Sequence, residues 1–145
     1  MRKILTVSFA ALVVLVAVSV ASGAASKAYS AKLTAGQETE KAQAAPANAG
    51  GTFKATLTGT TLKWTLTYAH LSGAAQQAHI HLGAKGKAGD VLVPLCSSPA
   101  SCKSPVKGSS KLTAVMIKAL NKGGTYVNVH TAKNLNGEIR GQILP

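Results

Sequence analysis

Two histidines separated by a single residue, His79 and His81, are the side chains of this sequence best suited to chemistry. In a β-strand alternate side chains point to the same side, so both imidazoles would share one face, with Cα atoms about 6.6 Å apart. Ile80, between them, would face the other way. Two imidazoles at this separation can bind one ion, and neutral imidazole is a common ligand of zinc and copper.

A third histidine, His130, lies in a segment with the same alternation. Val127 and Val129 are suited to a hydrophobic core, which would direct Tyr126, Asn128 and His130 to the opposite face. If this strand is a neighbour of the first, all three imidazoles meet on one surface.

Such a meeting would give zinc or copper three nitrogen ligands: His79, His81 and His130. Water, Asn128 or Glu138 would then take the fourth position. In the alternative arrangement no metal is involved, and the imidazoles hydrogen-bond to one another, to Asn128 or to backbone carbonyls. Both interpretations are compatible with the spacing of the residues.

Catalytic groups other than these histidines do not stand out in the sequence. A copper-zinc superoxide dismutase site would need more histidines than the four of this chain. Glu138 is able in principle to act as a base, but no nucleophile or paired carboxylate accompanies it. We therefore expect a protein that is not an enzyme; the alternative is a zinc or copper metalloenzyme that uses the same histidines.

Arg140 is the only arginine besides Arg2, in a chain that otherwise relies on lysine for positive charge. Its planar guanidinium carries five donors, and Glu138 is predicted on the same strand face as a candidate partner. We expect Arg140 to have a structural role, tying the last strand to its neighbours.

Short runs of alternating apolar and polar residues, separated by Gly, Pro and Ser, predict the strands that position these side chains. They cover residues 29–33, 53–57, 62–68, 78–82, 91–95, 125–131 and 138–144. Residues 36–50 read as a long connection, and the apolar spacing from Leu112 to Leu120 predicts a short helix with Gly123 at its end. Asn136-Gly137 favours a tight turn before the last strand. The pattern predicts a mainly β protein, an antiparallel sandwich or barrel with one short helix.

Cys96 and Cys102 are the only cysteines, and they enclose five residues of predicted loop. Nearby metal ligands are missing from this segment, and the spacing is wider than the Cys-x-x-Cys of redox motifs. Outside the cytosol such a pair is expected to form a structural disulfide.

The first 25 residues have the pattern of a secretory signal peptide. Arg2 and Lys3 precede the uncharged stretch 4–20, and small residues follow at 21–26, with cleavage expected after Ala25. The alternative is an uncleaved membrane anchor, since the apolar stretch is only slightly short of a bilayer span. Cleavage would leave one domain at residues 26–145.

The charge of the chain is strongly positive, with 16 Lys and Arg against 4 Asp and Glu. Without Arg2 and Lys3 the net charge falls from +12 to +10. Such an excess attracts polyanions, and outside the cell these include anionic envelope polymers. The chain has few aromatic residues on which bases could stack, which argues against nucleic acid. A membrane is a partner only if the leader is retained.

Four segments together resemble the CHRD domain: LTAGQE at 33–38, AHIHLG at 78–83, YVNVHT at 126–131 and GEIRGQI at 137–143. This domain is named after chordin, an extracellular antagonist of bone morphogenetic proteins, and also occurs alone in secreted bacterial proteins. The resemblance implies an immunoglobulin-like β-sandwich or barrel and no particular activity. It leads us to expect a secreted or surface-associated module that binds an extracellular protein or an anionic envelope polymer.

Overall fold

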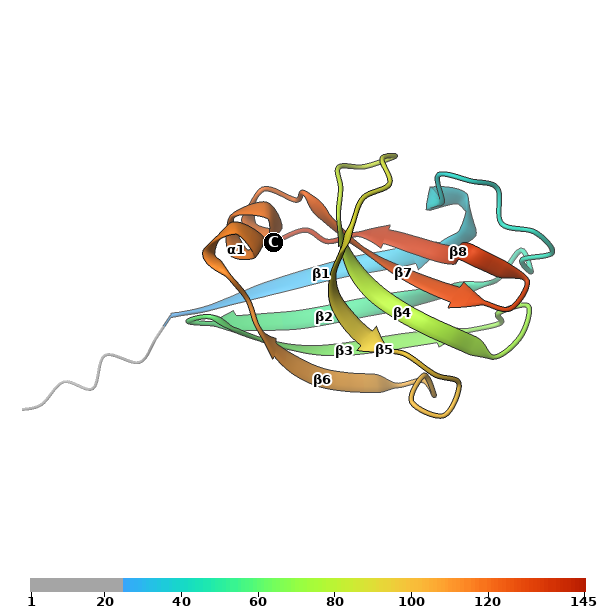
Figure 1. The fold of residues 1–145 in the computed structure, drawn as a ribbon, viewed down its shortest axis with the longest axis horizontal. Helices are drawn as coiled ribbons and strands as arrows, with labels where there is room; N and C mark the ends of the chain where they lie inside the picture. Colours follow the sequence, from blue (N-terminus) through green and yellow to red (C-terminus); the bar gives the residue numbers. More distant parts are fainter. Residues whose placement is uncertain (1–24) are drawn as a thin grey trace, which may run out of the picture.

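The computed structural model describes residues 25–145, which form eight β-strands and one short α-helix (Figure 1). The elements follow in the order β1 (Ser26–Thr34), the 3-10 turn η1 (Ala35–Gln37), β2 (Gly50–Thr58), β3 (Thr61–Ala69), β4 (Ala75–Leu82), β5 (Val91–Cys96), β6 (Val106–Lys111), α1 (Ala114–Asn121), β7 (Thr125–Thr131) and β8 (Asn134–Gln142). The strands pair antiparallel in the spatial order β5-β4-β7-β8-β1-β2-β3-β6, so β5 and β6 are the two edges of a nearly closed barrel. The predicted fold class, a mainly β antiparallel sandwich or barrel with one short helix, is confirmed. The signal peptide predicted at residues 1–25 lies outside the described residues, except for Ala25.

The core is built from the alternation seen in the sequence. In β1, β2 and β3 every second side chain is buried, and in β7 Val127 and Val129 are fully buried. The fully enclosed residues come from strands on both sides of the barrel, among them Phe53, Leu62 and Ile139. Burial of such side chains is the main force that closes a barrel of this size.

An eighth strand, β6, occupies a segment that the sequence pattern left without structure. Its residues are mostly polar, but it pairs with β3 from Thr61↔Lys111 to Leu66↔Val106. Gly108 stands opposite Trp64, and a Cβ at this position would collide with the indole ring. The absence of a side chain at Gly108 therefore makes room for Trp64. The same absence removes the apolar residue from which a strand would be predicted.

The turn before the last strand lies earlier than predicted. β7 ends at Thr131 and β8 begins at Asn134, so the chain reverses at residues 132–133 and Asn136-Gly137 lies inside β8. Gly137 has a φ of 129°, and a Cβ there would meet the side chains of Asn128 and Glu38. The glycine thus serves a close approach between elements instead of a hairpin turn.

The single helix agrees with its prediction. The Thr113 side chain accepts a hydrogen bond from the Met116 amide at its start, and Gly123, with a φ of 66°, follows its end. Asn121 accepts hydrogen bonds from Lys27 and Tyr29, which attaches the helix to β1. Within residues 25–145 there is no helix of the length and apolar character that a bilayer crossing demands.

The two cysteines form the predicted disulfide. Cys96 ends β5, and its Cα atom lies 5.2 Å from that of Cys102. Both residues are buried. The bond therefore fixes the chain where it leaves one edge strand of the barrel on its way to the other.

Candidate metal centre

The two histidine-bearing strands, β4 and β7, are direct neighbours, which is the condition for the three imidazoles to meet. In the ladder between β4 and β7, His79 stands opposite Asn128 and His81 opposite Tyr126. His130 pairs with Gln77 and so lies diagonal to His79. Directly paired residues of antiparallel strands share a face, and the alternating valines of β7 point to the core. The histidines therefore lie on the outer face of the barrel wall.

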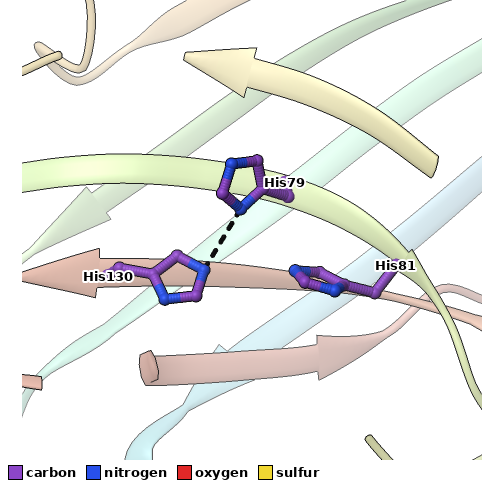
Figure 2. Close-up of side chains that lie close together, drawn as sticks. All are labelled: His79, His81 and His130. Atoms are coloured by element: carbon purple, nitrogen blue, oxygen red, sulfur yellow. Dashed lines mark hydrogen bonds between the residues drawn. The ribbon is translucent and has the colours of Figure 1, made fainter. Parts of the chain in front are cut away.

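The three imidazoles form one cluster (Figure 2). One ring nitrogen from each residue lies within 4.8 Å of the others. His79 Nδ1 is 3.2 Å from His130 Nε2, a distance compatible with a hydrogen bond. It is also close to the spacing of about 3.3 Å expected between two nitrogens of a tetrahedral zinc site. The fourth histidine, His70, does not belong to the cluster.

Hydrogen bonds to backbone carbonyls fix the protonation of two rings. His81 Nδ1 is 2.9 Å from the carbonyl of Gly89, and His130 Nδ1 is 2.8 Å from that of Leu135. A carbonyl only accepts, so each Nδ1 carries the proton and each Nε2 presents a lone pair. The Nε2 of His130 faces His79, whereas the Nε2 of His81 is buried and has no hydrogen-bond partner among the described residues.

The environment keeps the cluster neutral. Burial, with the neighbouring His130 and His81 acting in the same direction, lowers the pKa of His79 to about 4. Burial also lowers the pKa values of His81 and His130, against the opposing effect of their carbonyl hydrogen bonds. All three imidazoles are therefore uncharged at neutral pH, and the neutral imidazole is the form that binds a metal ion.

The connection between β4 and β5, residues 83–90, covers the cluster from one side. Gly89 holds it in place: its carbonyl accepts from His81, and its amide donates to the Tyr126 hydroxyl over 3.3 Å. A Cβ at Gly89 would run into the backbone carbonyl of Leu82. Only glycine allows the connection to approach β4 this closely.

Arg140 secures the same connection from the far side of Tyr126. Its guanidinium lies 3.4 Å from the centre of the Tyr126 ring, and that ring is stacked on His81 with centroids 4.9 Å apart. The guanidinium also donates to the carbonyls of Ala84 and Lys87. The requirement for a planar cation with several donors explains an arginine at this position. Arg140 thus links β8 to Tyr126 and to the connection 83–90.

Glu138 is neither a partner of Arg140 nor a member of the histidine cluster. It is fully buried and accepts hydrogen bonds from Ser72, Thr131 and Asn134. Burial by itself would raise the pKa of Glu138, but these hydrogen bonds lower it below the usual value. The pairing with Arg140 expected from the shared strand was wrong, because the irregular start of β8 turns Glu138 toward Thr131, whose side chain is also fully buried.

Glu38, which the sequence did not single out, contacts Asn128, the residue that pairs with His79. Both of its carboxylate oxygens accept from the Asn128 amide, at 2.8 and 2.9 Å. Asn128 stands opposite His79, and its Oδ1 is buried with no partner among the described residues. Burial raises the pKa of Glu38 to about 7, although the charge of Arg140 and the Asn128 hydrogen bond act in the opposite direction. The carboxyl group can therefore exchange a proton near neutral pH.

Together these features define a small antiparallel β-barrel with a half-buried histidine cluster on its outer wall. A family model, that of the CHRD domain, matches residues 29–143. The match spans most of the chain, so the protein belongs to the CHRD domain family. Neither a curated protein nor a solved structure gives a match. The CHRD domain and the disulfide together suggest an extracellular fold.

Proposed function

We propose that this protein is a non-enzymatic CHRD module of the cell exterior that binds one zinc or copper ion through His79, His81 and His130. The observation that carries the proposal is the Nε2 atom of His81, a buried lone pair without a hydrogen-bond partner among the described residues. Leaving such an atom unpaired costs about 1–3 kcal/mol, and a metal ion bound to it would recover this free energy.

The groups behind the ligands support the same proposal. Metal-binding histidines usually donate their second ring nitrogen to a carbonyl or carboxylate, which fixes the ring and its tautomer. His81 and His130 have such acceptors in the backbone carbonyls of Gly89 and Leu135. His79 has no carbonyl partner for either nitrogen among the described residues, so its ring is free to exchange its hydrogen bond with His130 for a metal ligand bond.

Metal titration of the purified domain tests the proposal. We expect one zinc or copper ion per chain at neutral pH, measured by calorimetry and by elemental analysis after dialysis. His79→Ala and His130→Ala should each weaken binding about tenfold or more. His70→Ala is the matched control, because it removes a histidine outside the cluster and should leave the affinity unchanged.

Two results would contradict the site. One is the absence of stoichiometric metal after incubation with both ions; the other is an equal loss of binding in the His70 variant. Thermal unfolding of each variant without metal shows whether the fold has survived the substitution.

The proposed location rests on the leader pattern together with the disulfide. The first strand, β1, begins at Ser26, so cleavage after Ala25 would leave the whole sheet intact. The oxidising exterior would keep the Cys96–Cys102 bond formed. Outside the cell, intracellular chelators would also not compete with the protein for zinc or copper.

A metalloenzyme is the second candidate, and the position of Glu38 favours it. A carboxyl group with a pKa near neutrality, held by Asn128 opposite His79, would be suited to accept a proton from water on an ion bound by the three histidines. The metal-loaded protein should then hydrolyse an activated ester, and Glu38→Gln should lower the rate without releasing the metal. If the loaded protein shows no turnover above that of the metal-free protein, the non-enzymatic proposal stands.

A further inference from the structure

The outer face of β1, β2, β3 and β6 carries a regular array of lysine, serine and threonine. Figure 1 shows these four strands side by side, and their ladders align Ser30 with Lys54, Lys54 with Thr65, and Thr65 with Lys107. Hydrogen bonds between Thr52 and Thr67 and between Ser26 and Thr58 link neighbouring strands on this face. The array therefore lies on four paired strands that hold its side chains in register.

Four of the lysines follow one diagonal across the sheet: Lys32, Lys54, Lys63 and Lys111. Each lies one strand across and two residues along from the previous one, because Lys32 pairs with Thr52, Thr56 with Lys63, and Thr61 with Lys111. From the strand spacing and the rise per residue, consecutive lysines are about 8 Å apart at their Cα atoms, so the row is about 25 Å long. We call these four residues the lysine diagonal. Lys107 flanks it.

This face is purely cationic. The four acidic residues of residues 25–145 are Glu38, Glu40, Asp90 and Glu138, and none of them belongs to these four strands. The middle of the lysine diagonal borders a shallow hollow of about 520 Å³, whose lining includes Lys54, Lys63, Thr56 and Thr65. Ammonium groups beside hydroxyl donors on an open surface are suited to phosphate oxygens.

We propose that the lysine diagonal binds a linear polymer of phosphate groups, laid across β1, β2, β3 and β6. A row of evenly spaced cations has the shape of an extended polyanion, and several weak contacts along one chain add up to measurable affinity. The proposal does not depend on the histidine cluster, which lies on other strands, β4 and β7.

The surroundings of the lysine diagonal favour such a polymer over two other polyanions. Docking on an anionic bilayer usually adds apolar anchors, but the large apolar side chains exposed on the described residues are Leu82, Val91, Val115, Leu135 and Leu144, none of which lies on these strands. Single-stranded nucleic acid requires exposed aromatic rings, whereas Tyr29, Phe53 and Trp64 of these strands are buried and Tyr68 is half-buried.

Binding of a medium-length inorganic polyphosphate to the full mature chain tests the proposal. A variant with Lys32, Lys54, Lys63 and Lys111 all changed to Gln is compared with a control in which Lys41, Lys103, Lys118 and Lys133 are changed to Gln. All eight side chains are exposed, and both variants lose the same charge. We expect the diagonal variant to bind about tenfold or more weakly, with a salt dependence reduced by about 0.7 in the logarithmic slope for each lysine removed. The control should stay within about twofold of the wild type.

Equal losses in the two variants would overturn the proposal, because they would mean that net charge alone attracts the polymer. Undiminished binding by the diagonal variant would overturn it as well. Preference of the protein for vesicles of anionic phospholipid over polyphosphate would assign the face to a membrane instead. Thermal unfolding of both variants, together with their zinc titration, confirms that fold and histidine cluster are intact.

Discussion

The orientation and protonation of His81 are set by its neighbouring residues. Its Nδ1 proton is directed to the Gly89 carbonyl, and its ring is stacked on Tyr126, whose other face carries Arg140. Burial lowers the pKa of His81, and the charge of Arg140 adds to this effect, while Gly89 and Asp90 oppose it. The ring is therefore neutral and fixed in one tautomer before any ligand arrives.

Glu38 allows a pH-dependent prediction at the scale of one residue. Burial raises its pKa to about 7 from an ordinary value of 4.5. The folded state thus holds the proton more tightly than the unfolded state. The stabilising contribution is fully present below about pH 4.5 and is lost as the pH rises through about 7. Glu38→Gln should therefore gain free energy of unfolding relative to the wild type between pH 4.5 and 8, on the order of 1–2 kcal/mol.

Urea unfolding of both proteins across this range measures the difference. The histidines act in the opposite sense: the pKa of His79 is lowered to about 4, so its contribution is lost as the pH falls from about 6.5 toward 4. That effect is common to both proteins and cancels in the comparison. A difference that does not change with pH would show that Glu38 is ionised alike in the folded and unfolded states.

The histidines could be predicted from sequence, whereas Glu38 could not. His79, His81 and His130 are placed by strand alternation, a rule that acts over a few residues. Glu38 reaches Asn128 across 90 positions of sequence, from a segment whose composition indicates only a loop. The same holds for Arg140, whose type suggested a special role but whose carbonyl partners depend on the folding of residues 83–90.

At the scale of elements, the connection 83–90 is the part of the fold that shapes the histidine cluster. Arg140, Tyr126 and His81 each hold it through its backbone, so its position is coupled to the orientation of the rings. Its glycines permit this close approach. A change in the backbone of the connection should therefore alter the metal site without touching a ligand.

Gly89→Ala tests this coupling. The added Cβ would collide with the Leu82 carbonyl, so the connection must move and His81 loses its hydrogen bond to Gly89. We expect about tenfold weaker binding of zinc or copper in a calorimetric titration. Gly73→Ala is the matched control, because a Cβ at Gly73 would meet no atom within 4 Å. Wild-type affinity in the Gly89 variant would show that the connection does not orient the ligand.

Elements with a strong apolar alternation were predicted, and the exceptions have a physical cause. In β6, Gly108 lies opposite Trp64, and the indole ring fills the space that an apolar side chain would otherwise occupy. The segment therefore lacks the apolar residue by which a strand is predicted. Asn136-Gly137 has the composition of a turn, but its glycine is needed where β8 passes Asn128 and Glu38. In both cases a contact between distant segments decided the residue type.

On the scale of the whole molecule, the barrel separates two surfaces. The acidic residues of the described chain lie outside β1, β2, β3 and β6, and Glu138 among them is fully buried in β8. The strands β1, β2, β3 and β6 present lysines without carboxylates. The proposed metal ion and the proposed polyanion would therefore occupy different faces of the barrel and would not compete for the same residues.

The sheet has its two edges at β5 and β6, and the disulfide restrains the chain between them. Replacing Cys96 and Cys102 together by Ala should lower the free energy of unfolding by about 2–3 kcal/mol, because the unfolded chain is no longer restricted by the cross-link. Both cysteines are buried, so small cavities add to this loss.

Urea unfolding with and without a reductant measures the effect. The reductant should destabilise the wild type by a similar amount and leave the double variant unchanged. An unfolding midpoint of the wild type that does not respond to reduction would mean that β5 and β6 are held by packing alone, and that the barrel does not depend on an oxidising exterior.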